Sequence, residues 1–74
     1  MSYFYDMILE MKLSLTDDNV VEIVTPTPNG DTTIRKNDKI CCVDGMMIIN
    51  RKNGNKCILD LEYIVKVYTR RKDL

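Results

Sequence analysis

Two turn dipeptides, Asp44-Gly45 and Asn53-Gly54, divide residues 40–68 into three short apolar runs at nearly even spacing. Each dipeptide favours a tight hairpin, because Asp, Asn and Gly tolerate the positive φ angles that such turns require. Three short runs joined by tight turns are typical of a β-meander. The sequence therefore predicts an antiparallel meander over residues 39–69.

The turns also predict a register, if each dipeptide supplies the two central residues of its hairpin. Val43 then pairs with Met46, and Arg51 pairs with Lys56. Directly opposed residues share one face of a sheet. One face therefore holds the residues Cys41, Val43, Met46, Ile48, Cys57, Leu59 and Leu61. The other face holds Ile40, Cys42, Met47, Ile49 and Ile58.

The second of these faces is unexpectedly apolar, because a solvated face of an antiparallel sheet should be polar. The N-terminal segment, a second sheet or another chain must cover Met47, Ile49 and Ile58. These three residues are the candidate partner-binding site.

Residues 7–16 alternate between apolar and polar side chains, and only Ile8 breaks the alternation. A period of two predicts a strand with one buried face. A helix over residues 3–11 is the alternative, since Met, Leu, Glu and Lys favour helices.

Two further strands are expected before the meander. Residues 19–27 form one, which Pro26 and Pro28 end because proline cannot donate to a ladder. Residues 32–34 form a short one, and polar turns are expected at residues 17–19, 28–31 and 35–38. The predicted fold is all-β: a single small domain over residues 1–74, built as a five- to six-stranded antiparallel barrel or sandwich.

The 74 residues carry 11 basic and 11 acidic side chains, so the net charge is zero. A dedicated nucleic-acid-binding domain would usually be basic. The charges are nevertheless unevenly spread. Residues 1–34 hold six acidic side chains and one basic, a net of −5, whereas residues 51–74 hold seven basic and three acidic, a net of +4. Either internal charge pairing or a functional basic patch would account for this asymmetry.

Cysteine and histidine usage limits the chemistry. Three cysteines fit a reducing cytoplasm better than a disulfide framework. Cys41 and Cys57 should stand two strands apart, about 10 Å, which exceeds the roughly 7 Å a disulfide spans. The chain has no histidine, so the commonest general base and a common metal ligand are missing. We expect no enzyme activity, metal or cofactor.

With no membrane span and no signal peptide visible, we expect a cytoplasmic protein.

Basic residues gather in two predicted loops and the C-terminal tail. With Tyr63 or Tyr68 stacking on bases, they could bind phosphates of nucleic acid. The alternative is that the loop lysines are merely solvated and the tail charges prevent edge-to-edge strand pairing. The candidate nucleic-acid-binding residues are Arg35, Lys36, Lys39, Arg51, Lys52, Lys56, Arg70, Arg71 and Lys72.

Residues 38–69 resemble the second half of small SH3-like and Sm-like β-barrels. The resemblance lies in Asp38-Lys39-Ile40 entering a strand, the two Gly hairpins, and Leu59 to Ile64 leading to Val67. It implies a short 3₁₀ turn at Leu61-Glu62-Tyr63. The spacing is also similar to that of bacterial Sm-like RNA chaperones, but the lysine–histidine pair with which they contact RNA has no counterpart here. No functional residue is carried over.

Three hypotheses follow. The first is a non-enzymatic interaction module that binds a protein partner or itself, through the apolar face of Met47, Ile49 and Ile58 or through a sheet edge. This profile is found by analogy among accessory and regulatory proteins of phages and mobile elements. The second is a protein that binds RNA or single-stranded DNA through its basic loops and tail. The third is a structural subunit whose sheet edge completes a larger sheet.

Overall fold

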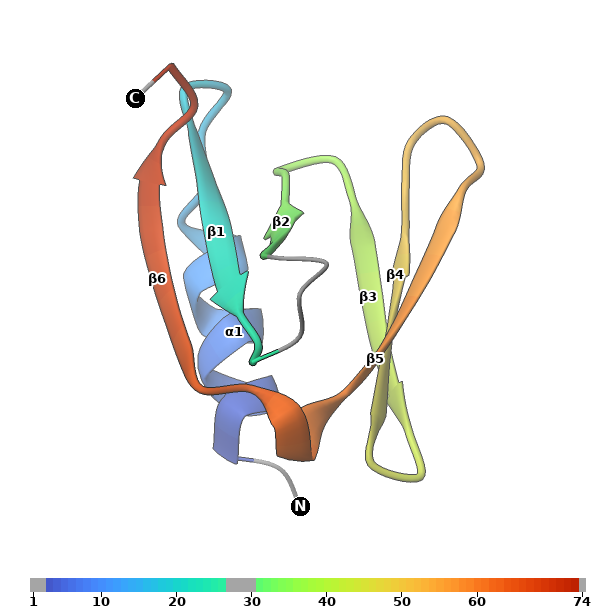
Figure 1. The fold of residues 1–74 in the computed structure, drawn as a ribbon. Helices are drawn as coiled ribbons and strands as arrows, with labels where there is room; N and C mark the ends of the chain where they lie inside the picture. Colours follow the sequence, from blue (N-terminus) through green and yellow to red (C-terminus); the bar gives the residue numbers. More distant parts are fainter. Residues whose placement is uncertain (1–2, 27–30, 74) are drawn as a thin grey trace.

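A computed structural model describes residues 3–26 and 31–73. The elements in chain order are α1 (Tyr3–Leu13), β1 (Asn19–Val24), β2 (Thr32–Ile34), β3 (Lys39–Val43), β4 (Met46–Asn50), β5 (Lys56–Asp60), the 3₁₀ turn η1 (Leu61–Tyr63) and β6 (Lys66–Arg71) (Figure 1). The turn expected over residues 28–31 lies largely outside the described residues.

The strands form two three-stranded antiparallel sheets, ordered β2-β1-β6 and β3-β4-β5. The sheets stand on opposite sides of the molecule, and η1 carries the chain from β5 back to β6 (Figure 1). Among the described residues no ladder joins one sheet to the other. The prediction of a mostly β, antiparallel fold is confirmed. The fold also contains a helix, and its strands do not close into a barrel.

The hydrophobic core lies between the sheets. The first sheet contributes Val21, Ile23 and Ile34, and the second contributes Met47 and Ile49. Ile8, Leu15, Leu61 and Ile64 complete the buried cluster. Burial of these side chains is the main favourable contribution to folding in so small a domain.

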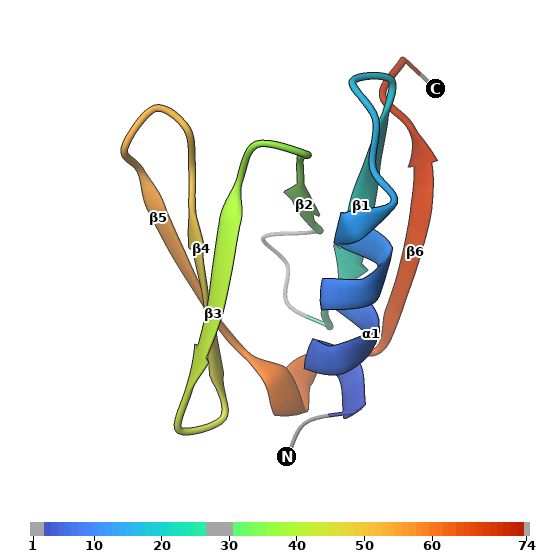
Figure 2. The ribbon, with the colours of Figure 1, turned by 180° about the vertical axis from the view of Figure 1, so that it is seen from behind.

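The N-terminal segment is the helix α1, so the strand predicted over residues 7–16 is wrong and the helical alternative is correct. Ile8, the residue that breaks the alternation, is the one helix residue that is fully buried. Phe4, Ile8 and Met11 follow a spacing of four and three, which places them on one side of a helix. α1 lies across β1 (Figure 2) and brings Ile8 into the core.

The first hairpin of the meander has the predicted register. Val43 pairs with Met46, and Ile40 pairs with Ile49. Asp44 and Gly45 have φ angles of 51° and 79°, which is the pair of positive values that a two-residue type I′ turn requires.

The second hairpin is shifted by one residue from the predicted register. Lys56 pairs with Asn50 rather than with Arg51. The Arg51 amide donates to the Asn55 carbonyl at 2.7 Å, so the loop has three residues, with Gly54 last at a φ of 93°. A three-residue loop that ends in a residue with positive φ is the next commonest hairpin after the two-residue turns.

This shift exchanges the two faces of β5, because neighbouring residues of a strand point to opposite sides. Cys57 and Leu59 face the core with Met47 and Ile49, whereas Ile58 faces outward and is 62% exposed. The prediction that Ile58 shares a face with Met47 and Ile49 is therefore wrong. Cys41 and Cys57 also lie on opposite faces, and all three cysteines are free.

The remaining elements lie close to their predicted positions. β1 ends at Val24, before Pro26, and β2 covers residues 32–34 as expected. The expected 3₁₀ turn is present as η1, and the Asp60 side chain caps it by accepting from the Glu62 amide at 2.9 Å. On β1, the buried Glu22 accepts from Arg70 Nε on β6 at 2.7 Å, which ties these two strands together.

Substitution of Ile8 by alanine tests the contribution of α1. We expect Ile8→Ala to lower the free energy of unfolding by about 2–5 kcal/mol, because it leaves a cavity in a packed core. Leu13→Ala is the matched control, since Leu13 is 82% exposed, and it should change stability by less than about 0.5 kcal/mol. Urea denaturation measures both. Equal midpoints for the two variants would show that α1 does not stabilise the core.

Candidate functional site

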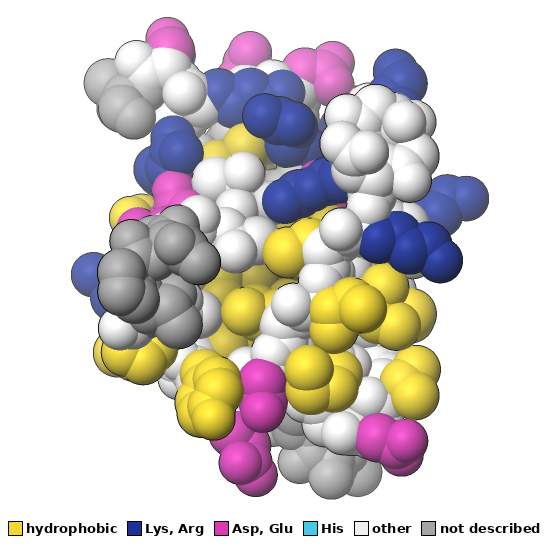
Figure 3. Space-filling view, turned by 45° about the vertical axis from the view of Figure 1, so that its right-hand side comes forward, with side chains coloured by type: hydrophobic (Ala, Val, Ile, Leu, Met, Phe, Trp, Pro, Cys, Tyr) yellow, Lys and Arg dark blue, Asp and Glu magenta, His cyan; other side chains and the backbone are white. Residues whose placement is uncertain are grey.

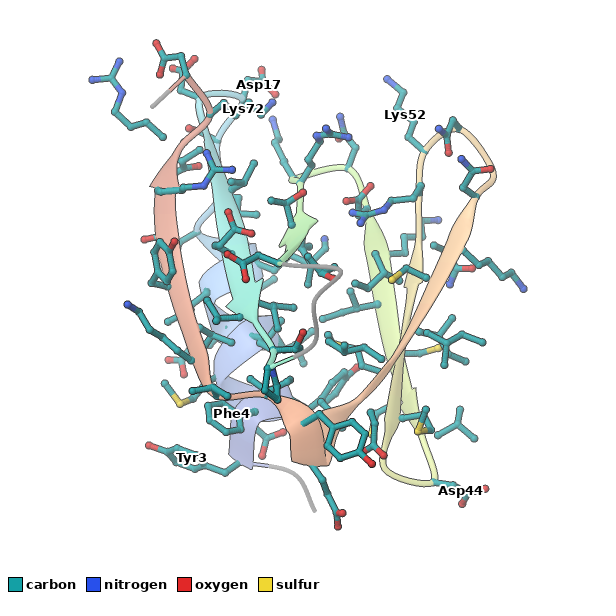
Figure 4. All side chains as sticks on the ribbon, viewed as in Figure 1. Tyr3, Phe4, Asp17, Asp44, Lys52 and Lys72 are labelled. Carbon is teal, nitrogen blue, oxygen red and sulfur yellow. The ribbon has the colours of Figure 1, made fainter. Side chains whose placement is uncertain are left out.

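A cavity of about 370 Å³ opens at the end of the molecule where the strand-connecting loops meet. The turn between β2 and β3 and the loop between β4 and β5 form most of its wall. Asp17 and Lys72, which lie at the same end of the molecule as Lys52 (Figure 4), complete it. We call it the basic cavity. Its lining residues are Asp17, Thr33, Arg35, Lys36, Asn37, Asp38, Arg51, Lys52, Asn53, Asn55, Lys56 and Lys72.

An ion pair between Asp38 and Arg51 anchors this wall. Arg51 Nη1 lies 2.8 Å from Asp38 Oδ2, and the two side chains are only 20% and 4% exposed. The same nitrogen donates to the Thr33 carbonyl on β2. Asp38 Oδ2 also accepts from the Arg35 amide at 2.8 Å, which closes the turn before β3. These contacts fix the two basic loops relative to each other.

The exposed cations around the cavity are held less tightly. Lys36 Nζ lies 3.6 Å from Asp17 Oδ1, and both residues are exposed. Exposed pairs of this kind contribute little to stability, so a ligand can compete for the lysine. Arg35, Lys52, Lys56 and Lys72 are also exposed. The basic cavity therefore combines one half-buried, structural arginine with five accessible cations.

The charge of the basic cavity differs strongly from that of the chain as a whole. Its lining holds six cations and two carboxylates, a local net of +4 in a chain whose net charge is zero. Figure 3 shows lysine and arginine side chains gathered over the upper part of the molecule. A concave site with charge of one sign attracts ligands of the opposite sign.

Six of the nine candidate nucleic-acid-binding residues line the basic cavity, and three do not. Lys39 starts β3 outside the lining. Arg70 on β6 pairs with Glu22 on β1, and Arg71 Nε lies 3.9 Å from Oδ1 of the exposed Asp73. The predicted tail cluster is therefore divided, with only Lys72 at the cavity.

The predicted stacking tyrosines lie outside the basic cavity. Tyr63 is an exposed residue of η1, and Tyr68 lies on β6 with Lys66 Nζ 4.9 Å from its ring centre. Every residue that lines the cavity is polar or charged. The cavity thus offers hydrogen bonds and positive charge, but no aromatic surface for a base.

The three candidate partner-binding residues do not form one surface. Met47 and Ile49 are fully buried and covered by the chain's own helix and first sheet. Only Ile58 is accessible. The second sheet does have an exposed apolar face, but it is the face opposite to the one predicted.

Asp38 is a site residue that the sequence does not single out. The local signal for it is an aspartate three residues after Arg35, a spacing at which a carboxylate can accept from the backbone amide three residues before it. Its partner Arg51 comes from a distant loop, and nothing local in the sequence indicates that pairing.

No family model matches the chain, and no match was found among curated proteins or solved structures. The resemblance to SH3-like and Sm-like barrels stays a prediction. Among the described residues, no group of three or more His, Cys, Asp or Glu side chains could hold a metal ion. In the same part of the chain, no helix combines the length and apolar character needed to cross a membrane.

Substitution of Arg51 by methionine tests the ion pair. Arg51→Met leaves Asp38 buried without its cationic partner, so we expect a loss of up to about 3–5 kcal/mol in the free energy of unfolding. Lys52→Met is the control, because Lys52 is the exposed neighbour in the same loop, and its effect should stay below about 0.5 kcal/mol. Denaturation in urea compares them. Similar losses in both variants would mean that the pair does not anchor the wall.

Proposed function

We propose that this chain is a non-enzymatic binding module that holds the phosphate backbone of RNA or single-stranded DNA in the basic cavity. The observation that carries the proposal is the gathering of basic residues from three separate parts of the sequence around one cavity. Lysine and arginine contacts to phosphates supply most of the affinity of sequence-independent nucleic-acid binding.

The composition of the cavity favours phosphate over base recognition. Its lining contains no aromatic ring on which a base could stack. Contacts to phosphates position a protein on nucleic acid but do not read its sequence. The proposed binding is therefore weakly dependent on sequence.

The number of accessible cations bounds the expected salt dependence. Arg51 is already engaged with Asp38 and Thr33, which leaves Arg35, Lys36, Lys52, Lys56 and Lys72 for a ligand. Five phosphate contacts on a single strand correspond to a slope of about −3.5 in a plot of log affinity against log salt.

Binding of a protein partner, or of the chain to itself, is the second candidate function. The observation that favours it is the exposed apolar face of the β3-β4-β5 sheet, which includes Val43 and Ile58. This face is distinct from the basic cavity.

Fluorescence anisotropy of a short labelled oligo(U) or oligo(dT) strand tests the nucleic-acid proposal. We expect the affinity to fall about a hundredfold between roughly 50 and 200 mM salt. In Lys52→Gln, which removes one cation of the cavity, the slope should decrease by about 0.7.

Lys66→Gln is the matched control, because it removes the positive charge of another exposed lysine that lies outside the cavity lining. Its slope should equal that of the unmodified protein. Absence of binding at low salt, or equal losses in the two variants, would reject the basic cavity as the binding site.

A further inference from the structure

The outward side of the β3-β4-β5 sheet carries three rows of side chains across its strands. The strand pairing aligns Lys39, Asn50 and Lys56 in the first row. The middle row is Cys41, Ile48 and Ile58, and the third is Val43, Met46 and Asp60. We call these nine residues the outer face.

The middle row and the neighbouring Val43 make the outer face largely apolar, and much of this apolar surface is accessible. Ile58 on β5 is 62% exposed, Val43 on β3 is 52% exposed, and Cys41 on β3 is also exposed. One solvated side of an antiparallel sheet is normally polar. A contiguous apolar surface rimmed by polar residues is typical of an interaction site.

The two ends of the outer face carry opposite charges. Lys39 and Lys56 stand at the end next to the loops of the basic cavity. Asp60 stands at the other end, where the Asp44 turn also lies (Figure 4). Figure 3 shows the same order on this side of the molecule, with basic side chains above the hydrophobic ones and acidic side chains below.

We propose that a second copy of this chain covers the outer face, in a symmetric dimer whose two-fold axis runs across the strands. The β4 strands of the two copies then stack in opposite directions. This arrangement places Lys56 of each copy against the partner's Asp60, and it joins the two apolar middle rows.

The charge pattern selects this orientation. When the strands of the two sheets are aligned, a two-fold face-to-face contact has its axis in the interface plane, either across the strands or along them. An axis along the strands would stack β3 on the partner's β5 and bring Lys39 against the partner's Lys56. Like charges placed opposite each other disfavour that contact.

The size of the outer face makes the dimer reversible. Five residues of strand span about 16 Å, and three strands span about 10 Å between their outer axes. Such a patch is well below the roughly 800 Å² that each partner buries in a standard stable interface. We therefore expect the dissociation constant of the dimer to be micromolar or higher. The proposal does not depend on nucleic-acid binding.

Analytical ultracentrifugation over a wide concentration range, without nucleic acid, tests the dimer. The average mass should rise from that of the monomer toward that of the dimer. Ile58→Asn should weaken the association at least about tenfold, because it places a polar group in the apolar middle row, where Ile58 packs against the partner's middle row. Val65→Asn is the control, since Val65 is equally exposed at 62% but lies outside the outer face, and it should leave the association unchanged.

A monomer at every concentration would overturn the proposal. So would a dimer that persists in Ile58→Asn, or a mass that exceeds that of the dimer. The last two results would point instead to pairing through the outer edges of β3 and β5, since each of these strands has β4 on one side and no strand of its own sheet on the other.

A charge exchange tests the orientation. Lys56→Glu alone and Asp60→Lys alone should each self-associate more weakly, because each places like charges together. An equimolar mixture of the two variants should regain association, since both contacts then join opposite charges. Failure of the mixture to associate would overturn the orientation across the strands. Asp60 also caps η1, so circular dichroism must first show that Asp60→Lys is folded. If it is not folded, the Ile58 and Val65 variants still decide whether the outer face is the interface.

Discussion

The ion pair between the buried Asp38 and the half-buried Arg51 connects the fold of this protein to its candidate site. A carboxylate that is almost fully buried is costly unless its charge is paired and hydrogen-bonded. Asp38 meets both conditions, through Arg51 Nη1 and the Arg35 amide, each at 2.8 Å. Arg51 also reaches the Thr33 carbonyl on β2, so one guanidinium links the first sheet to a hairpin of the second. These contacts therefore hold the wall of the basic cavity in place.

The sequence predicts the meander well because turns and apolar runs are local features, but it leaves the loop length of the second hairpin open. Asn53-Gly54 fits a two-residue turn, and Gly54 equally fits the last position of a three-residue loop. The predicted register ended in Arg51 opposite Lys56, and like charges directly opposite each other destabilise a sheet. The observed register places each of them opposite an asparagine instead. That like-charged pair was the available sign that the register was shifted.

The helix and the site show why the remaining features were harder to predict. Alternation over residues 7–16 concealed a helix, since residues at i and i+4 also coincide with a period of two. The deviation at Ile8 carried the information, because that residue fills the core. The basic clusters were found from sequence, but their convergence was not, because Lys72, Arg51 and Arg35 meet only through the tertiary fold. Burial of Met47 and Ile49 likewise depends on how α1 and the first sheet cover them.

Lys56 links the two proposed surfaces. It lines the basic cavity, and it also ends the first row of the outer face. One ammonium group cannot hold a backbone phosphate and the partner's Asp60 with full strength at the same time. If both proposals hold, nucleic acid and self-association must each weaken the other by the same factor, because coupling between two binding equilibria is reciprocal. A shared lysine thus makes the two functions antagonistic, whereas a dimer that joined the two cavities into one site would make them cooperative.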